Sequence, residues 1–366
     1  MYFIGIDIGT TSVKIIALDE KGTIAKSVSK EYPISFPKPL WSEQNPKDWL
    51  NESINGLKEI LDGLNKDEVK AIGFSGQMHG LVTLDEHDNV IRPAILWNDQ
   101  RTGNECDYLN KTIGQSEVSK WTGNLAIAGF TAPKILWLKK NEPENFQKIK
   151  KIMLPKDYVA YMMTGVFATD MSDASGTLYL DVKNRKWSAD MLEILEITND
   201  QLPKLYESYE VIGNMKPELL KELGLSSEVK VIIGGGDQAV AAVGSGVVKA
   251  GSCSLSLGTS GVVFTSNEEF FVDDNNSLHS FCHANGKYHL MGVTLAAAAS
   301  LKWWVESINC SKDYTEFLNE AEAAEISDNL FYLPYLMGER TPHNDPNCRG
   351  TFIGMNITHQ RKNMTR

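Results

Sequence analysis

The sequence predicts an α/β protein with two domains. The chain has 366 residues and 42% of them are hydrophobic, which is enough to fill two cores. Residues 231–244 combine a β-branched strand, a turn of three glycines and a helix of small residues, the strand–turn–helix order of an α/β fold. A Gly-Thr-hydroxyl turn between two strand candidates occurs in each half of the chain, at 8–12 and at 257–261. Two such turns at corresponding places suggest a duplicated fold.

Composition and charge argue against several classes of protein. A formal net charge of −11 disfavours a surface for nucleic acid or an anionic membrane, so we expect neither as a partner. The N-terminus lacks the basic start of a signal peptide, and no apolar run approaches the ~18 residues that span a bilayer. Five cysteines without a Cys-x-x-Cys spacing are typical of a reduced chain, so we predict a cytoplasmic location.

The chain begins with three strand candidates, at residues 2–6, 13–18 and 23–32, which predict an antiparallel meander. The first turn of this meander, Asp7–Ser12, contains an acid, a glycine and three hydroxyls. Such a turn can bind phosphates, and Asp7 can reach Mg²⁺ directly or through water. An ordinary hairpin turn is the alternative interpretation. The turn is not a Walker A loop, because no Gly-Lys-Ser/Thr follows a four-residue gap.

A helix and a polar strand end follow this meander. Asn45 and Pro46 form a strong helix start, and apolar residues then recur at helical spacing. The predicted strand 69–74 leads into Ser75–Gly80, whose polar groups lie at a strand's carboxyl end, where α/β proteins bind ligands. His79 in this turn is a candidate for binding a polar sugar. A structural histidine is an equally good interpretation.

The middle of the chain is predicted to be mainly helical. Helices are expected at residues 133–140 and 157–163, and residues 187–224 are expected to be mostly helical and polar. Residues 170–176 are expected to form a polar bend. We assign no site residue to this stretch.

Asp237 is the central candidate of the sequence. It follows three glycines at the carboxyl end of a strand, where ligands bind in α/β proteins, and Gln238 adds an amide beside it. A carboxylate in that place can take a proton from a bound substrate, so we predict that Asp237 is a general base. The alternative is an N-capping role for the following helix, because Asp is favoured there for local reasons.

The second half of the chain repeats the strand–turn–strand pattern of the first residues. Its expected elements are strands at 252–257 and 262–265, the turn 258–261 between them, and helices at 294–308 and 313–324. His279 and His283 flank strand-like residues and resemble metal ligands at first. No third or fourth ligand stands at a metal-binding spacing, so we predict a structural role for both.

Eleven short motifs resemble the FGGY family of carbohydrate kinases along essentially the whole chain. Each motif is weak alone, and their order and spacing make the resemblance specific. Within the family, the chain is most similar to members that phosphorylate D-xylulose. The motifs are Asp7–Ser12, Trp41–Gln44, Gly76–Gly80, Leu96–Asp99, Thr122–Asn124, Gly129–Lys134, Leu154–Tyr158, Asp170–Ala174, Gly234–Asp237, Ser256–Gly261 and Leu336–His343.

The resemblance implies two actin-like, ribonuclease-H-like domains, 1–245 and 246–366, around a cleft in which ATP and sugar meet. It implies ATP and Mg²⁺ as cofactors, D-xylulose as the substrate phosphorylated at its terminal hydroxyl, and a homodimer when the chain is complete. The implied site residues are Asp237 as catalytic base, Asp7 near Mg²⁺, Gln77, Met78, His79 and Gln238 at the sugar, and Thr10, Thr11, Ser12, Gly258 and Thr259 at the nucleotide phosphates.

One departure from the family concerns the C-terminus. Family members continue into a glycine-rich segment that holds adenosine and a long helix, so we expect an incomplete second domain and a chain that is inactive alone. Two alternatives stay open: another sugar or polyol kinase of the family, such as a ribulokinase or glycerol kinase, and a non-catalytic actin-like sugar-binding protein. Asp7 and Asp237 argue against the latter, because a sensor needs neither a base nor a metal ligand.

Overall fold

The computed structural model describes residues 1–225, 228–326, 329–345 and 347–366. These residues form two compact units. The first unit comprises Met1–Ala250, Ser266–Phe271 and Ser280–His289, and the second comprises Gly251–Thr265, Val272–His279 and Leu290–Arg366. Within the described ranges, no helix has both the length and the apolar character that crossing a membrane requires.

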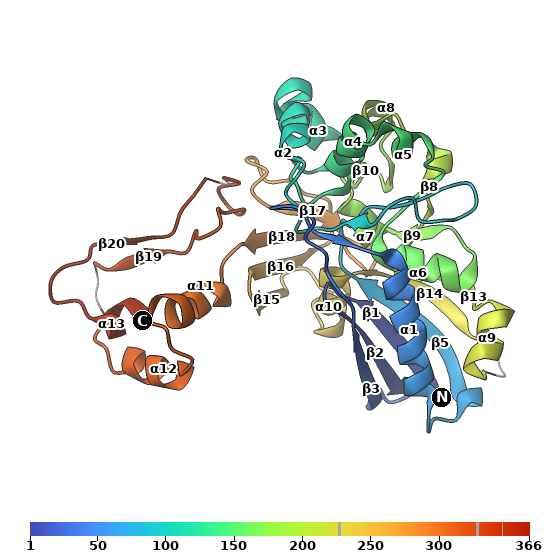
Figure 1. Cartoon of the computed structure of the whole chain (residues 1–366), viewed down its shortest axis with the longest axis horizontal. Helices are drawn as coiled ribbons and strands as arrows, with labels where there is room; N and C mark the ends of the chain where they lie inside the picture. Colours follow the sequence, from blue (N-terminus) through green and yellow to red (C-terminus); the bar gives the residue numbers. More distant parts are fainter. Residues whose placement is uncertain (226–227, 327–328, 346) are drawn as a thin grey trace. The chain divides into compact units, whose positions relative to one another are not determined.

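A six-stranded mixed sheet organises the first unit (Figure 1). Its strands, in spatial order, are β13 (Val211–Asn214), β14 (Lys230–Gly236), β5 (Val69–Gly76), β1 (Tyr2–Ile8), β2 (Ser12–Asp19) and β3 (Ile24–Glu31). Strands β1, β2 and β3 pair antiparallel, which confirms the predicted meander. Strand β5 pairs parallel with β1 on one side and with β14 on the other. The three parallel strands therefore end at the same edge of the sheet.

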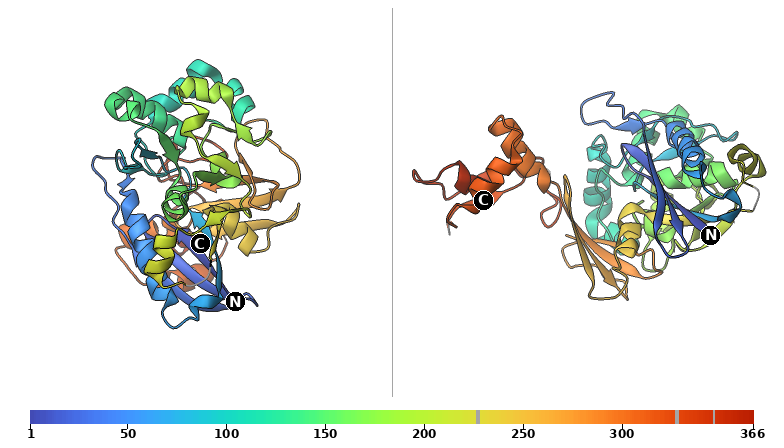
Figure 2. Two further views of the ribbon diagram at one scale, coloured as in Figure 1. Left: turned by 90° about the vertical axis from the view of Figure 1, so that its right-hand side faces the viewer. Right: turned by 90° about the horizontal axis from the view of Figure 1, so that it is seen from below.

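The core of the first unit forms against this sheet. Alternate residues of β1 are buried because successive side chains of a strand point to opposite faces: Ile4, Ile6 and Ile8. Helix α1 (Pro46–Leu61) packs on β2 and β3, and both figures show it in blue alongside these strands (Figures 1 and 2). Trp49 of α1 is fully buried. The Asn45 side chain caps α1 by accepting the Lys47 N–H, as the predicted helix start requires.

The first unit contains many shorter elements besides the sheet and α1. They are β4 (Glu43–Gln44), η1 (Lys66–Glu68), β6 (Val82–Leu84), β7 (Ala94–Ile95), α2 (Gly103–Asp107), η2 (Tyr108–Gly114), α3 (Gln115–Thr122), α4 (Thr131–Asn141), α5 (Pro143–Gln147), β8 (Lys151–Met153), α6 (Pro155–Thr164), β9 (Ala168–Asp170), α7 (Met171–Ser175), β10 (Leu180–Asp181), β11 (Lys186–Trp187), α8 (Ala189–Leu195), η3 (Asn199–Gln201), β12 (Lys204–Tyr206), α9 (Pro217–Leu223) and α10 (Asp237–Gly244). Helices α4 and α6 confirm the two predicted in this region.

Two predictions for the first unit are wrong. Residues 170–176, expected as a polar bend, contain the buried helix α7, because the Asp170 side chain caps it by accepting the Ser172 N–H. Residues 187–224, expected to be mostly helical, contain strands β12 and β13 besides helices α8 and α9. Strand β12 pairs parallel with β9, a partner that is distant in sequence and that a local pattern does not reveal.

The residues after Ala250 form further strands and helices. These are β15 (Cys253–Leu257), β16 (Gly261–Asn267), β17 (His279–Cys282), β18 (Tyr288–Thr294), α11 (Ala298–Lys302), η4 (Trp303–Ile308), α12 (Tyr314–Glu322), β19 (Phe331–Leu333), β20 (Thr351–Ile353) and α13 (Arg361–Thr365). Antiparallel pairing of β15 with β16 confirms the second predicted hairpin. The helix expected at 294–308 begins later, at Ala298, because Thr294 is still part of β18.

Candidate active site

The ends of three parallel strands bring the two predicted carboxylates to one edge of the sheet. Asp7 of β1 pairs with Ser75 of β5, and Ser75 pairs in turn with Gly235 of β14. Asp237 follows two residues later, as the first residue of α10. Asp7 therefore lies in β1 and Asp237 directly follows β14, the two strands that flank β5, at the edge where such folds bind ligands.

A β-bulge in β14 sets the position of Asp237. The register between β14 and β5 shifts between Ile232 and Gly235. Gly234 has a φ of 70°, and a Cβ atom there would lie 1.6 Å from the Phe74 carbonyl oxygen. Only glycine fits this position, because any side chain would overlap the neighbouring strand.

Asp237 has the surroundings of a general base. Gly236 takes the N-cap position of α10, and the Asp237 carboxylate accepts the Gln238 N–H at 2.7 Å. Burial, followed by the negative charge of Asp7, raises the pKa of Asp237 to about 7, against hydrogen bonds from Gln238 that lower it. A carboxylate with a pKa near neutrality can both accept and release a proton under physiological conditions. These surroundings suit the role predicted for Asp237.

Asp7 meets the requirements of a ligand for a cation. Its Oδ1 is buried and has no hydrogen-bond partner within the described residues. Its charge acts on Asp237, and a cation would relieve the repulsion between two such carboxylates. No group of three or more His, Cys, Asp or Glu side chains in the described ranges could hold a metal by itself. A cation here would take further oxygens from phosphate or water, as Mg²⁺ usually does.

Met78 and His79 follow β5, and Met78 lies beside the glycine turn of β14. A Cβ atom on Gly236 would lie 3.0 Å from the Met78 sulfur, so the methionine covers this turn. The His79 ring packs on Phe130, with ring centroids 4.9 Å apart, and its Nδ1 lies 2.7 Å from the Gly176 carbonyl oxygen. A carbonyl oxygen only accepts, so Nδ1 carries a proton, and in the neutral ring Nε2 is the acceptor. Such an acceptor suits a sugar hydroxyl.

The main chain of His79 is held by a buried lysine. His79 has a φ of 70°, which is uncommon for a residue with a side chain. Its carbonyl oxygen accepts hydrogen bonds from Lys134 Nζ at 2.8 Å and from Thr131 Oγ1 at 3.1 Å. Lys134 is fully buried and also donates to the Gly129 carbonyl at 2.8 Å. The segment 129–134 therefore fixes the conformation that presents the His79 ring.

Gln77 is buried in a network that braces the first phosphate turn. Its side-chain nitrogen donates to the Gly9 carbonyl at 3.3 Å and to Gln44 Oε1 at 3.1 Å. Gln44 in turn donates to the Thr10 carbonyl at 2.7 Å. The side-chain oxygen of Gln77 has no hydrogen-bond partner among the described residues. The sugar contact predicted for Gln77 stays a prediction.

Two aromatic residues add to this brace. Trp97 Nε1 donates to Thr10 Oγ1 at 3.0 Å, and the Tyr32 hydroxyl donates to the Gly9 carbonyl at 2.5 Å. Thr11, at the tip of the same turn, is exposed, and Ser12 is half-buried at the start of β2. The turn thus has a fixed shape and an exposed threonine, which suits phosphate binding.

The second predicted phosphate turn lies in the second unit. Gly258 and Thr259 are both exposed. Their carbonyl oxygens accept the N–H groups of Ala298 at 2.9 Å and Ala297 at 3.0 Å, which fixes the turn against the start of α11. The nucleotide contact predicted for this turn stays a prediction.

The sequence did not identify the residues that brace the first turn. Gln44 and Trp97 belong to motifs that carried the family resemblance, at 41–44 and 96–99, and this membership was the available signal. Nothing in the local pattern indicates that both side chains meet Thr10, because more than thirty residues separate each of them from it.

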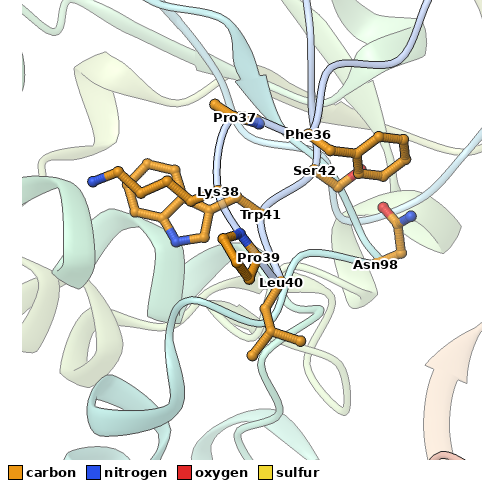
Figure 3. A pocket seen from close by; sticks show the side chains of 8 residues that line it. All are labelled: Phe36, Pro37, Lys38, Pro39, Leu40, Trp41, Ser42 and Asn98. Atoms are coloured by element: carbon orange, nitrogen blue, oxygen red, sulfur yellow. The ribbon is translucent and has the colours of Figure 1, made fainter.

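A pocket of about 460 Å³ lies elsewhere in the first unit, against a proline-rich loop (Figure 3). It is lined by Phe36, Pro37, Lys38, Pro39, Leu40, Trp41, Ser42 and Asn98. Lys38 and Arg101 both stack over the Trp41 ring, at 4.4 and 3.7 Å from its centroid. None of the predicted site residues lines this pocket, and we assign no role to it.

Comparison with known proteins identifies the family. Residues 2–244 match the N-terminal domain of the FGGY family of carbohydrate kinases, and residues 253–366 match its C-terminal domain, which confirms the predicted two-domain α/β class. The xylulose kinase of Escherichia coli (strain K12) is 46% identical over 359 residues, which cover 98% of this chain and 73% of that protein. The xylulose kinase of Bacillus subtilis (strain 168) is 42% identical over 369 residues, which cover 100% and 74%. A crystal structure of a xyloylose kinase from Brucella ovis matches with a TM-score of 0.95 and 38% identity, covering 100% of this chain and 75% of that one. The chain belongs to the FGGY family of carbohydrate kinases.

Proposed function

We propose that this protein transfers the γ-phosphoryl group of ATP to the terminal hydroxyl of D-xylulose, giving D-xylulose 5-phosphate. The similarity to xylulose kinases along 98–100% of the chain supports this substrate. The observation that carries the proposal is the placement of Asp7 in β1 and of Asp237 directly after β14, the two strands that flank β5, with Met78 against the glycine turn before Asp237. A base and a cation ligand serve phosphoryl transfer to a hydroxyl, and an imidazole can help to bind that hydroxyl's sugar.

In the proposed reaction, Asp237 accepts the proton of the attacking hydroxyl. The hydroxyl oxygen forms a bond to the γ-phosphorus, the bond between this phosphorus and the β,γ-bridging oxygen breaks, and ADP leaves. His79 accepts a hydrogen bond from the sugar, Gln77 and Gln238 offer amide groups, and Met78 supplies an apolar wall. The residues mainly position the reactants, because phosphoryl transfer demands little covalent help from a protein.

The phosphate chain is assigned to both Gly-Thr turns. We propose that Thr10, Thr11 and Ser12 bind it in the first unit and that Gly258 and Thr259 bind it in the second. Asp7 would hold Mg²⁺ together with phosphate oxygens and water, which fits its buried and unpartnered Oδ1. Such an ion would neutralise phosphate charge.

Replacement of the base tests the proposal. Asp237→Asn keeps the shape of the side chain but cannot take a proton. In the complete protein, we expect ADP release with D-xylulose to fall at least a hundredfold in kcat, a change of about 2.7 kcal/mol, while calorimetry shows nearly unchanged sugar binding. Retention of more than about a tenth of kcat, a loss below ~1.4 kcal/mol, would exclude Asp237 as the base. Higher kcat/KM for D-ribulose or glycerol than for D-xylulose in the same assay would favour the alternative family activities.

We also propose a cytoplasmic location and, for the active enzyme, a homodimer. Five free cysteines support a reducing compartment. The dimer rests on the family resemblance, and sedimentation of the purified protein would test it. The domain limits 1–245 and 246–366 likewise stay predictions.

A further inference from the structure

A lysine without solvent exposure lies at the centre of the first unit. Lys156 of α6 is fully buried, and so are the three carboxylates around it. Its Nζ lies 2.6 Å from Asp157 Oδ1, 2.8 Å from Asp170 Oδ1 and 3.4 Å from Asp173 Oδ2. The proposed reaction uses none of these four groups. Buried charges are expensive, so their arrangement calls for an explanation beyond packing.

A chain of hydrogen bonds leads from this cluster to the glycine turn. The second oxygen of Asp170, Oδ2, accepts the Ser172 hydroxyl at 2.6 Å and the Ser172 N–H at 2.8 Å. The Ser172 hydroxyl oxygen accepts the N–H of Gly236 at 3.1 Å. Gly236 immediately precedes Asp237. The path from Lys156 to the Gly236 backbone therefore has three links. They are the Lys156–Asp170 ion pair, the hydrogen bond from Ser172 to Asp170, and the hydrogen bond from Gly236 to Ser172.

Steric contacts show that the glycine turn before Asp237 packs directly against Ser172. A Cβ atom on Gly235 would lie 2.6 Å from the Ser172 hydroxyl oxygen, so the backbone approaches this side chain as closely as glycine permits. The Ser208 hydroxyl also donates to Asp170 Oδ2 at 2.6 Å and lies 3.4 Å from the Ser172 hydroxyl oxygen, but in the part of the chain that the structure describes no hydrogen bond joins it to Gly236. The Ser208 main-chain carbonyl accepts the Gly234 N–H at 3.1 Å. Both serine hydroxyls thus donate to the Asp170 carboxylate, and of the two only the Ser172 hydroxyl also accepts the Gly236 N–H.

We propose that Ser172, oriented by the buried Lys156–Asp170 pair, is a positioning residue that fixes the backbone of Gly236 and thereby aims the Asp237 carboxylate. This inference rests on the proposed role of Asp237 as the base. The three glycines before Asp237 have no side chains with which to hold their own conformation, so the turn depends on contacts supplied by its neighbours. An oriented hydroxyl at the last glycine supplies such a contact. Displacement of a reacting group by about 1 Å can lower a rate a hundredfold, so this contact bears on kcat.

A matched pair of variants tests the proposal: Ser172→Ala and Ser208→Ala, each made in the complete protein. Both remove a hydroxyl that donates to Asp170, and only Ser172→Ala removes the acceptor of the Gly236 N–H. For Ser172→Ala we expect kcat for D-xylulose to fall about tenfold or more, with KM for the sugar within about twofold of wild type. For Ser208→Ala we expect kcat within about twofold of wild type. Ser172→Cys keeps a weak acceptor and should lie between Ser172→Ala and wild type.

A second measurement does not depend on turnover. Amide hydrogen exchange across residues 231–240 should be faster in Ser172→Ala and unchanged in Ser208→Ala, because only the first variant frees the Gly236 N–H. Equal exchange in both variants, or equal loss of kcat in both, would overturn the proposal and leave a merely structural role for the network. Failure of the proposed function itself would look different, since Asp237→Asn would then remain active. An inactive Asp237→Asn together with a fully active Ser172→Ala would refute the positioning role alone.

Discussion

Replacement of Lys156 by methionine is the sharpest test of the buried cluster. Methionine retains most of the volume of the lysine stem but carries no charge. The substitution leaves Asp157, Asp170 and Asp173 buried without their shared cation. We expect the first unit to remain foldable and to lose a large part of its stability at neutral pH.

The contacts of Lys156 set the size of this loss. Removing one partner of a buried ion pair typically costs about 3–5 kcal/mol, and this lysine serves three carboxylates, so we expect a value near the upper end at pH 7. Burial lowers the pKa of Lys156, but the charges of the three aspartates outweigh it, so the net shift is upward and the amine is charged. Removal of the amine therefore removes a full positive charge.

The loss should also depend on pH. Burial raises the pKa of Asp157 and of Asp173 above the ordinary range even though Lys156 opposes the rise. Without the lysine these pKa values rise further. For each aspartate, the folded state then binds more protons than the unfolded state at pH values between its unfolded-state pKa and its higher folded-state pKa. The free energy of unfolding therefore falls as the pH rises through this interval. The difference between wild type and Lys156→Met should be larger at pH 8 than at pH 5.

Urea denaturation followed by tryptophan fluorescence is the appropriate assay. All tryptophans except Trp303 and Trp304 belong to the first unit, so the signal reports chiefly on that unit. Lys139→Met is the matched control, because the Lys139–Glu196 pair, 2.6 Å apart, is 35% and 64% exposed and should contribute only about 0–1 kcal/mol. A loss below about 1 kcal/mol at pH 7, or one that does not change between pH 5 and pH 8, would refute the reasoning.

Two further substitutions address the site itself. His79→Ala should raise KM for D-xylulose about tenfold, roughly 1.4 kcal/mol, and leave KM for ATP nearly unchanged; an effect confined to ATP would place the sugar elsewhere. Gly234→Ala should lower the free energy of unfolding by more than about 3 kcal/mol, because its Cβ would lie 1.6 Å from the Phe74 carbonyl oxygen. Gly73→Ala is a suitable control in denaturation, since a Cβ there meets nothing within 4 Å, and similar stabilities of the two variants would contradict the bulge geometry.

Local patterns predicted the elements that depend on local chemistry. The start of α1 followed from Asn45 and Pro46, and the meander β1–β3 followed from apolar runs separated by glycine turns. The strand–turn–helix around Asp237 was predicted because glycine, β-branched and small residues each favour one conformation there. These signals are contained within a few residues, so no tertiary contact is needed to interpret them.

The predictions that failed concern elements that depend on contacts between residues distant in sequence. Residues 187–224 were predicted to be mostly helical, but strand β12 is stabilised by β9, about thirty-six residues earlier along the chain, with Tyr206 opposite Asp170. Residues 170–176 were expected to form a polar bend, but they contain the buried helix α7. It is buried because Lys156 offers charge compensation, and that lysine comes from another helix. The hydrogen bonds by which Gln77 braces the first turn were not predicted either, because only the folded sheet brings Gly9 and Gln44 close to it.

Two lysines of the first unit, Lys134 and Lys156, have fully buried side chains. An amine-reactive reagent can reach either Nζ only when the surrounding structure opens, whereas Lys47 on α1 is exposed and reacts freely. The ratio of the labelling rates at buried and exposed lysines therefore gives the population of the open state. Lys134 would report opening around the His79 loop, and Lys156 would report opening of the carboxylate cluster. The chain thus carries two intrinsic chemical probes, one for each region, that need no engineered label.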